Sequence, residues 1–334
     1  DPLRDYGGAR PDWATARWSS GKFKVAALNK ATFGINGTHR PGEVHGVGGG
    51  TLSYLAYAVR MVPDDFHTYS SDGVGMDWPI TYEELVPYYR KVELELGVSG
   101  QAGDPWTPFV EPYPNPPFPF SYANKSIKRG CDKLGIRLWP TPMARLSRPF
   151  DGRPMCVQCG DCSGGCMSGA KSSIDVTYLS KAEATGKMIL RPECIATRIK
   201  IDSQGKAKSV IYFDKNGVEH EQEAEVIVFS AGAIQSPRLL LNSTSKLFPD
   251  GLANSSGLVG KYFMQHLPLF SDAVFPDRID SYRGFFGGAT SQDFAKSSST
   301  NSFARGWCIE LHSGITAPVQ LALKSPMWGA QLKD

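Results

Sequence analysis

The sequence lacks several features that define broad classes of protein. Its 334 residues contain no apolar run that approaches the length of a bilayer-spanning helix. Its 36 basic and 33 acidic side chains leave a net charge of +3, with no block of lysine or arginine. Because phosphate binding needs a concentrated basic face, this balance argues against nucleic acid as a partner. The chain has no internal repeat and no heptad, and its length suits about two globular domains.

Cysteine is scarce outside one segment. Three of the seven cysteines, Cys131, Cys194 and Cys308, are isolated. This irregular set does not resemble the framework of a disulfide-stapled secreted domain, and we expect each of the three to be a small buried hydrophobic residue. The other four cysteines lie within eleven residues.

Two helices are predicted between residues 81 and 134. Thr81 and Glu84 form the T-x-x-E pattern of a capping box, and apolar residues then recur on one face until Gly97. A second helix is expected over about residues 121–134. Residues 105–119 contain seven prolines among aromatic side chains, which excludes a regular helix or an inner strand. We interpret them as an extended arm or lid, or as an inert crossing between domains.

Strand patterns follow the cysteine-rich segment. Short β-branched and apolar runs predict strands over residues 188–190, 196–201, 209–213 and 226–229. Asn216-Gly217 predicts a hairpin turn between two of them. Beyond residue 262, short apolar runs alternate with loops rich in glycine and serine, which predicts an antiparallel sheet with long connections.

A glycine cluster is the first candidate for cofactor binding. Its members are Gly46, Val47, Gly48, Gly49, Gly50 and Thr51. The apolar residues after it end before Pro63, which predicts a tight turn that feeds a helix. Residues without side chains let backbone N–H groups approach a phosphate or a planar ring. A flexible turn without a ligand is the alternative. The cluster is not a dinucleotide-binding fingerprint, because no strand pattern precedes it.

The turn after the last predicted strand is the second candidate. Its members are Ser230, Ala231, Gly232 and Ala233. The apolar run over 226–229 predicts a buried strand that turns sharply toward a helix at 238–242. α/β sheets bring their backbone against nucleotides at this carboxyl end of a strand. Many sheets end this way without a ligand.

The cysteine-rich segment has the spacing C-x2-C-x2-C-x3-C. Its thiols belong to Cys156, Cys159, Cys162 and Cys166. This spacing places several thiolates around one pocket, and the interleaved glycines leave N–H groups that can point at inorganic sulfide. We interpret the segment as an iron-sulfur site, either a [4Fe-4S] cluster on four thiols or a [3Fe-4S] cluster on three. Tetrahedral zinc and paired disulfides are the alternatives.

Taken in order, these motifs resemble the glucose-methanol-choline (GMC) oxidoreductases, flavoproteins that oxidise alcohols and sugars. The glycine cluster is similar to the first signature of the family, and the segment from Gly232 to Pro237 is similar to the second. Ile195 and Ala196 resemble a strand whose backbone meets the adenine in relatives. The resemblance implies FAD contacts at Val47, Gly48, Gly49, Gly50, Thr51, Ile195, Ala196, Ser230, Ala231, Gly232 and Ala233.

Three cysteines also match one branch of that family. Cys156, Cys162 and Cys166 resemble cysteines in the catalytic subunits of membrane-associated sugar and sugar-acid dehydrogenases, and Cys159 is additional. In that branch a [3Fe-4S] cluster passes electrons from the flavin to a cytochrome c subunit, and a small subunit assists export and assembly. The resemblance therefore implies a location at the periplasmic side of the bacterial inner membrane, through a partner subunit.

Departures from the family pattern shape the remaining expectations. Ser53 lies where some relatives carry a histidine that bonds to flavin, so we expect non-covalent FAD. The G-x-G-x-x-G unit and the histidine that takes the substrate proton are both absent. We therefore expect a central segment of the protein, with the catalytic base outside it and little activity by itself.

The expected fold is an incomplete α/β FAD-binding Rossmann-like domain with an α+β substrate domain that contains an antiparallel sheet. The first is assigned to residues 1–60 and 156–261, and the second to 61–155 and 262–334. The expected reaction is oxidation of a CH–OH group of a sugar, polyol or sugar acid by hydride transfer to flavin. Electrons would leave through the iron-sulfur cluster to a cytochrome-type acceptor. A GMC-type oxidase that uses O2 and a non-enzymatic metal-binding module are the alternatives.

Overall fold

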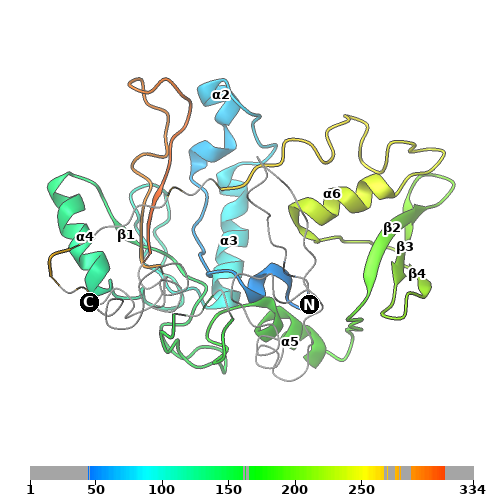
Figure 1. The fold of residues 1–334 in the computed structure, drawn as a ribbon, viewed down its shortest axis with the longest axis horizontal. Helices are drawn as coiled ribbons and strands as arrows, with labels where there is room; N and C mark the ends of the chain where they lie inside the picture. Colours follow the sequence, from blue (N-terminus) through cyan, green and yellow to red (C-terminus); the bar gives the residue numbers. More distant parts are fainter. Residues whose placement is uncertain are drawn as a thin grey trace, which may run out of the picture. The chain divides into compact units, whose positions relative to one another are not determined.

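The structure is a computed structural model that describes residues 44, 46–160, 162, 165–266, 269, 275–277, 279 and 287–312. The chain divides into two compact units, and Figure 1 labels most of their helices and strands. Unit 1 takes in the chain up to Met188 and from Phe275 onward, and unit 2 takes in Ile189–Val274. Over the described residues, no helix has the length and apolar composition needed to cross a bilayer.

Helix α3 (Tyr82–Leu96) confirms the first predicted helix. At its start, the Glu84 backbone N–H donates to Thr81 Oγ1 at 3.2 Å, and the Thr81 N–H donates to Glu84 Oε2 at 2.7 Å. These two bonds satisfy N–H groups that the first turn of a helix leaves without partners. The helix ends at Gly97, whose φ of 68° lies in the left-handed region.

Helix α4 (Tyr122–Lys133) confirms the second predicted helix, and it packs against a small sheet in unit 1. The sheet has the order β1–β5–β6, with β1 at Trp139–Pro140, β5 at Ala289–Ser291 and β6 at Ile309–Leu311, and all its pairs are antiparallel. The shared core contains Cys131, Leu138, Ala289 and Leu311. The predicted antiparallel sheet is therefore confirmed, and it recruits a two-residue strand that was not predicted.

The segment after the glycine cluster corrects one prediction. Instead of feeding a helix that continues toward Pro63, the cluster leads into a single 3-10 turn, η1 (Gly49–Leu52), and the chain then runs extended. Its backbone bonds across to another segment: the Ala58 N–H donates to the Pro142 carbonyl at 2.9 Å, and the Ala144 N–H donates to the Ala56 carbonyl at 2.7 Å. These long-range bonds replace the helical ones. Further short helices of unit 1 are η2 (Pro63–Phe66), α2 (Thr68–Asp72), η3 (Ile174–Val176) and α5 (Tyr178–Ala184).

Unit 2 is a three-stranded meander with one helix. Its strands β2 (Ile195–Ile201), β3 (Ala207–Phe213) and β4 (Glu219–Glu223) pair antiparallel in sequence order. The predicted hairpin turn at Asn216-Gly217 is confirmed, but it joins β3 to β4, a strand that was not predicted. Helix α6 (Gly232–Asn242) lies against β2 (Figure 1). There the Ile199 N–H donates to Ser243 Oγ at 2.8 Å.

Two predicted strands do not form. Residues 188–190 and 226–229 have no ladder partner among the described residues, and Ile189, Val226 and Val228 are 78–82% exposed. An apolar run becomes a strand only where neighbouring strands supply hydrogen bonds. In unit 2, β4 takes the place beside β3 that the 226–229 run was expected to occupy.

The isolated cysteines and the proline-rich segment have mixed outcomes. Cys131 is buried as predicted, whereas Cys194 is half-buried and Cys308 is exposed. Cys308 lies just before β6, outside the paired ladder, and this explains its exposure. Residues 105–119 form no regular helix, as predicted, and bury Phe109 and Phe118.

Both sheets of the described residues are antiparallel. The parallel sheet of a Rossmann-like domain is not found among them, and that part of the fold prediction stays a prediction. The predicted boundaries of a discontinuous FAD-binding domain and a substrate domain also stay predictions.

Candidate functional site

The glycine loop, defined as residues 46–54, is held in shape by Thr51. Thr51 Oγ1 donates to the Gly48 carbonyl at 2.5 Å and accepts from the backbone N–H of Ile174 at 3.0 Å. The first bond closes the turn on itself, and the second fixes it to η3. Gly48 and Gly49 have φ values of 108° and 54°, a region that favours residues without a Cβ.

The glycines of this loop serve two different needs. A Cβ at Gly48 would lie 2.9 Å from Leu52 Cδ2, so this position must stay small for the loop to close. A Cβ at Gly49 or Gly50 would meet nothing within 4 Å. Their missing side chains therefore leave open space beside the backbone, which suits the close approach of a planar ring or a phosphate. On this observation, the loop fits a flavin cofactor.

A buried lysine joins the glycine loop to the cysteines. Lys171 is 1% exposed, and its Nζ donates to the carbonyls of Leu52 at 2.8 Å, Tyr54 at 3.0 Å and Cys162 at 2.8 Å. Burial lowers the pKa of Lys171 to about 8, because desolvation disfavours the charged form. One side chain thus connects two motifs that lie more than a hundred residues apart in sequence.

A buried carboxylate lies beneath the same loop. Asp175, in η3, is 3% exposed, and a Cβ at Gly48 would lie 3.5 Å from its own Cβ. Its Oδ1 has no hydrogen-bond partner among the described residues. Burial raises the pKa of Asp175 above its ordinary value. Sequence reasoning missed both Asp175 and Lys171, because neither belongs to a motif and only tertiary burial distinguishes them.

The cysteine loop, defined as residues 156–166, directs polar hydrogens at three of its sulfurs. Arg145 Nη1 donates to Cys162 Sγ at 3.0 Å, the Lys171 backbone N–H donates to Cys166 Sγ at 3.2 Å, and the Gln158 N–H donates to Cys156 Sγ at 3.4 Å. Cys159 is exposed.

Three of the four thiols have shifted pKa values. Burial raises the pKa of Cys156, and the hydrogen bond from the Gln158 N–H opposes it. Burial raises the pKa of Cys162, with Arg145 and Lys171 opposing it. Burial also raises the pKa of Cys166, but hydrogen bonds from Ser168 and from the Lys171 backbone outweigh it and hold that pKa below its ordinary value. Cys166 is therefore the most readily ionised of the three.

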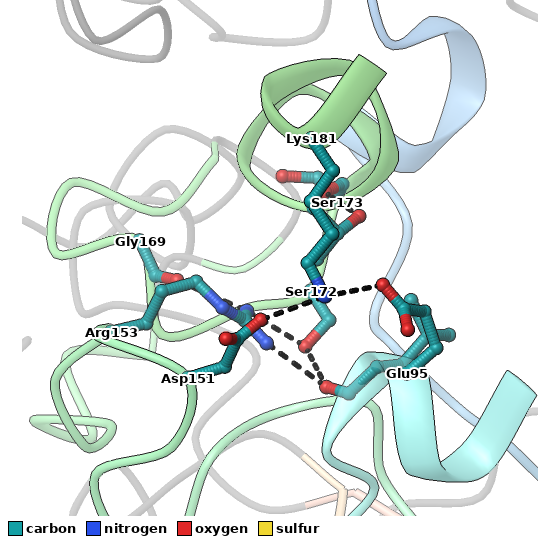
Figure 2. Close-up of polar contacts among 9 residues, drawn as sticks. Glu95, Asp151, Arg153, Gly169, Ser172, Ser173 and Lys181 are labelled. Atoms are coloured by element: carbon teal, nitrogen blue, oxygen red, sulfur yellow. Dashed lines mark hydrogen bonds and ion pairs between the residues drawn. The ribbon is translucent and has the colours of Figure 1, made fainter. Parts of the chain in front are cut away.

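A polar network clamps the segments on either side of the cysteine loop. Figure 2 shows Lys181 between Glu95 and Asp151, with which it forms ion pairs. Arg153 Nη1 donates to Ser172 Oγ at 3.0 Å, and its Nη2 donates to the Leu96 carbonyl at 3.1 Å. Asp151 and Arg153 precede the loop, Ser172 follows it, and Glu95 and Leu96 end helix α3. The network therefore fixes both ends of the cysteine loop to the same helix terminus.

The arrangement of the thiols limits what the loop can hold as it stands. Among the described residues, no three cysteine, histidine, aspartate or glutamate side chains gather closely enough to hold a metal ion. The donor chemistry of the loop suits an iron-sulfur cluster, since N–H groups reach the sulfurs, but its geometry does not fit one. None of the four cysteines forms a disulfide. The predicted ligand set of Cys156, Cys159, Cys162 and Cys166 therefore stays a prediction.

The other predicted FAD contacts lie in unit 2. Ile195 and Ala196 are exposed at the start of β2, and Ser230 to Ala233 are exposed where α6 begins. The Ala231 N–H donates to Ser236 Oγ at 3.1 Å, which shapes this turn. The predicted contacts of the glycine loop, Val47 to Thr51, lie in unit 1. The contribution of the unit 2 residues to the same site stays a prediction.

Comparisons with known proteins match this pattern of motifs. Residues 39–268 match the family model for GMC oxidoreductase. The chain is 36% identical over 231 residues to the fructose dehydrogenase large subunit of Gluconobacter japonicus, covering 68% of this chain and 42% of that protein. It is 34% identical over 306 residues to 2-methyl-1,2-propanediol dehydrogenase of Mycolicibacterium austroafricanum, covering 85% and 54%.

A third relative is named as an oxidase. The chain is 34% identical over 226 residues to 6'''-hydroxyparomomycin C oxidase of Streptomyces lividus, covering 66% of this chain and 41% of that protein. The chain spans about half or less of the length of these relatives. The family match covers more than two thirds of the chain, and the two dehydrogenases share over a third of the aligned residues. The chain belongs to the GMC oxidoreductase family.

Proposed function

We propose that this chain is part of an FAD-dependent dehydrogenase that oxidises a CH–OH group of a sugar, polyol or sugar acid. Family membership supports the reaction class. The names of two relatives, a fructose dehydrogenase subunit and a propanediol dehydrogenase, support a hydroxyl-bearing substrate.

One structural observation carries the proposal: the open backbone surface at Gly49 and Gly50. The hydrogen bonds of Thr51 to Gly48 and Ile174 support a defined path for the backbone at this surface. Bound there without a covalent bond, FAD would supply the two-electron acceptor for a hydride. The alcohol carbon loses a hydride and its hydroxyl loses a proton, which leaves a carbonyl product. The protein holds the cofactor and keeps the loop from moving.

The flavin assignment is tested by closing that open space. Gly50→Ala adds a methyl group that meets no protein atom within 4 Å. The variant should stay as stable as the wild type, while its dissociation constant for FAD rises about tenfold or more, or about 1.4 kcal/mol. Gly130→Ala, at a second glycine with nothing within 4 Å, is the matched control and should leave FAD binding unchanged. An unchanged FAD affinity in Gly50→Ala would refute flavin contact at this loop.

The reaction is tested on the purified full-length protein without oxygen. Fructose, gluconate and 2-methyl-1,2-propanediol should be tried in turn, and one substrate of this class should bleach the visible absorption of bound flavin. If sugars, sugar acids and polyols all leave the oxidised flavin spectrum intact, the substrate assignment is wrong.

A sugar or alcohol oxidase is the second candidate, favoured by the name of the Streptomyces relative. An oxidase returns the two electrons to O2 and forms H2O2. A dehydrogenase instead reacts slowly with O2 and passes electrons to another acceptor. Measured side by side, turnover with a dye acceptor should exceed H2O2 formation, and the reverse ratio would favour the oxidase.

An iron-sulfur exit for the electrons is the finer part of the proposal. It is supported by the cysteine spacing and by the N–H groups that reach three sulfurs. To hold a cluster, the four thiols would have to move closer together. For this reason we assign the path of the electrons only from the substrate to the flavin. Iron and sulfide analysis of anaerobically purified protein tests it. If the analysis finds zinc, or no metal at all, the iron-sulfur exit is wrong. The cytochrome c subunit and the export subunit, which the resemblance implies as partners, would then have no support.

A further inference from the structure

We propose that Lys171 couples the glycine loop to the cysteine loop, so that flavin bound at the first loop stabilises the second. The inference rests on the proposed function, because it takes FAD as the ligand of the glycine loop. It assigns a positioning role to Lys171, which belongs to neither the glycine loop nor the cysteine loop.

The hydrogen bonds of the ammonium group carry the inference. A lysine ammonium has three N–H donors, and the three acceptors of Lys171 Nζ are all backbone carbonyls. Leu52 and Tyr54 belong to the glycine loop, and Cys162 belongs to the cysteine loop. The acceptors are main-chain atoms, so each bond constrains the path of a loop rather than the rotamer of a side chain.

Removing the ammonium would separate the loops. The three carbonyl oxygens point at one buried position, and their partial negative charges repel one another without a cation between them. Burial also denies them water as a replacement, so each oxygen would have to turn elsewhere for a donor. A methionine at residue 171 fills a similar volume and offers no donor.

The backbone beside Lys171 reinforces the link. Its own N–H donates to Cys166 Sγ at 3.2 Å, and the next carbonyl, that of Ser172, accepts from the Tyr54 hydroxyl at 2.9 Å. A shift of the glycine loop therefore moves the same two residues that hold the cysteine loop. By reciprocity, the free energy with which bound FAD stabilises the cysteine loop equals the free energy with which an ordered cysteine loop strengthens FAD binding.

Hydrogen–deuterium exchange on the full-length protein, with and without FAD, tests the coupling. The N–H of Gly165 donates to the Cys162 carbonyl that also accepts from Lys171, so peptides from this region report on the link. In the wild type, FAD should slow exchange in the glycine loop and also in peptides covering residues 165–170, the latter about fivefold or more. Helix α4 is the internal control and should not respond.

The variant Lys171→Met separates coupling from simple binding. With FAD at saturation, the glycine loop of this variant should still gain protection, while residues 165–170 gain none. Its FAD affinity should fall about tenfold. Lys200→Met removes an exposed lysine that pairs with Glu221 in unit 2, and it should behave as the wild type.

Each outcome has one reading. FAD protection of residues 165–170 that persists in Lys171→Met overturns the inference. The inference is also overturned if FAD protects only the glycine loop in the wild type. This second comparison needs no variant, so it stands even if Lys171→Met fails to fold. No FAD-dependent protection of the glycine loop in the wild type overturns the proposed function instead.

Discussion

The pair formed by Arg60 and Glu93 shows how a single contact organises unit 1. Both side chains are at most 5% exposed, and two hydrogen bonds of 2.7 and 2.8 Å join the guanidinium to the carboxylate. The guanidinium also lies 3.7 Å from the centre of the Phe109 ring. The pair therefore connects the segment after the glycine loop, helix α3 and the proline-rich segment.

Breaking this pair should be strongly destabilising. Glu93→Gln leaves a buried guanidinium without its counter-charge, so the free energy of unfolding should fall by about 3–5 kcal/mol in urea titrations. The double variant Arg60→Met with Glu93→Leu replaces both partners, and its free energy of unfolding should fall by less than that of Glu93→Gln alone. Lys128→Met breaks the exposed pair with Asp132 and should change stability by only about 0.5 kcal/mol. Equal losses in the exposed and buried variants would contradict this account.

Asp293 should make unit 1 sensitive to acid. Its carboxylate accepts from Trp106 Nε1 at 2.9 Å and from the Arg137 backbone N–H at 2.7 Å. Burial raises the pKa of Asp293, but these bonds and the Arg137 charge outweigh it and hold the pKa below its ordinary value. The folded state thus binds fewer protons here than the unfolded state. The stabilisation is complete above about pH 3.9 and is lost as the pH falls through the lower, folded pKa.

Asp293→Asn tests that assignment. The variant keeps the size of the side chain and loses its charge, so its free energy of unfolding at pH 7 should drop by about 1–2 kcal/mol. The lost interaction requires the ionised carboxylate. The difference in the free energy of unfolding between variant and wild type, the stability gap, should therefore narrow as the pH falls below about 4. A gap that does not change with pH would show that the charge of Asp293 is not responsible.

At the scale of elements, two glycines should respond in opposite ways to the same change. At Gly97, which ends α3, a Cβ would lie 2.6 Å from Phe150 Cδ1, and the φ of 68° already disfavours a side chain. Gly97→Ala should therefore destabilise the protein by about 2 kcal/mol or more. At Gly130, inside α4, nothing lies within 4 Å, so Gly130→Ala should stabilise it by about 0.5–1 kcal/mol. Thermal unfolding measures both, and shifts of the same sign would contradict the assignment.

The elements also show how far prediction from sequence reaches. Helix α3 was predicted because its capping box and its apolar face are both local signals. The run over 226–229 carried an equally strong apolar signal and forms no strand, because a strand depends on partners from elsewhere in the chain. The glycine loop was located correctly, whereas the helix expected after it is replaced by bonds to Pro142 and Ala144.

At the scale of the whole molecule, the proposed electron exit through the cysteine loop predicts that this loop affects only one half of the reaction. If electrons leave through it, Cys162→Ser should slow transfer to an external one-electron acceptor and leave flavin reduction by substrate unchanged. The serine hydroxyl can still accept from Arg145, so the loop should keep its fold. Stopped-flow absorption separates the two half-reactions, and Cys308→Ser, at an isolated exposed cysteine, is the control. Equal slowing of both halves in Cys162→Ser would contradict an electron path through the loop.

The sequence by itself determined the family, the two long helices, the glycine loop and the crowded cysteines, because short spacings and local periodicity encode each of them. Only the tertiary structure decided that Lys171 lies between the two loops and that Asp175 is buried beneath Gly48. Burial and the direction of a side chain depend on segments that are distant in sequence. No local pattern can report which carbonyls a lysine will meet, since the fold brings those carbonyls together.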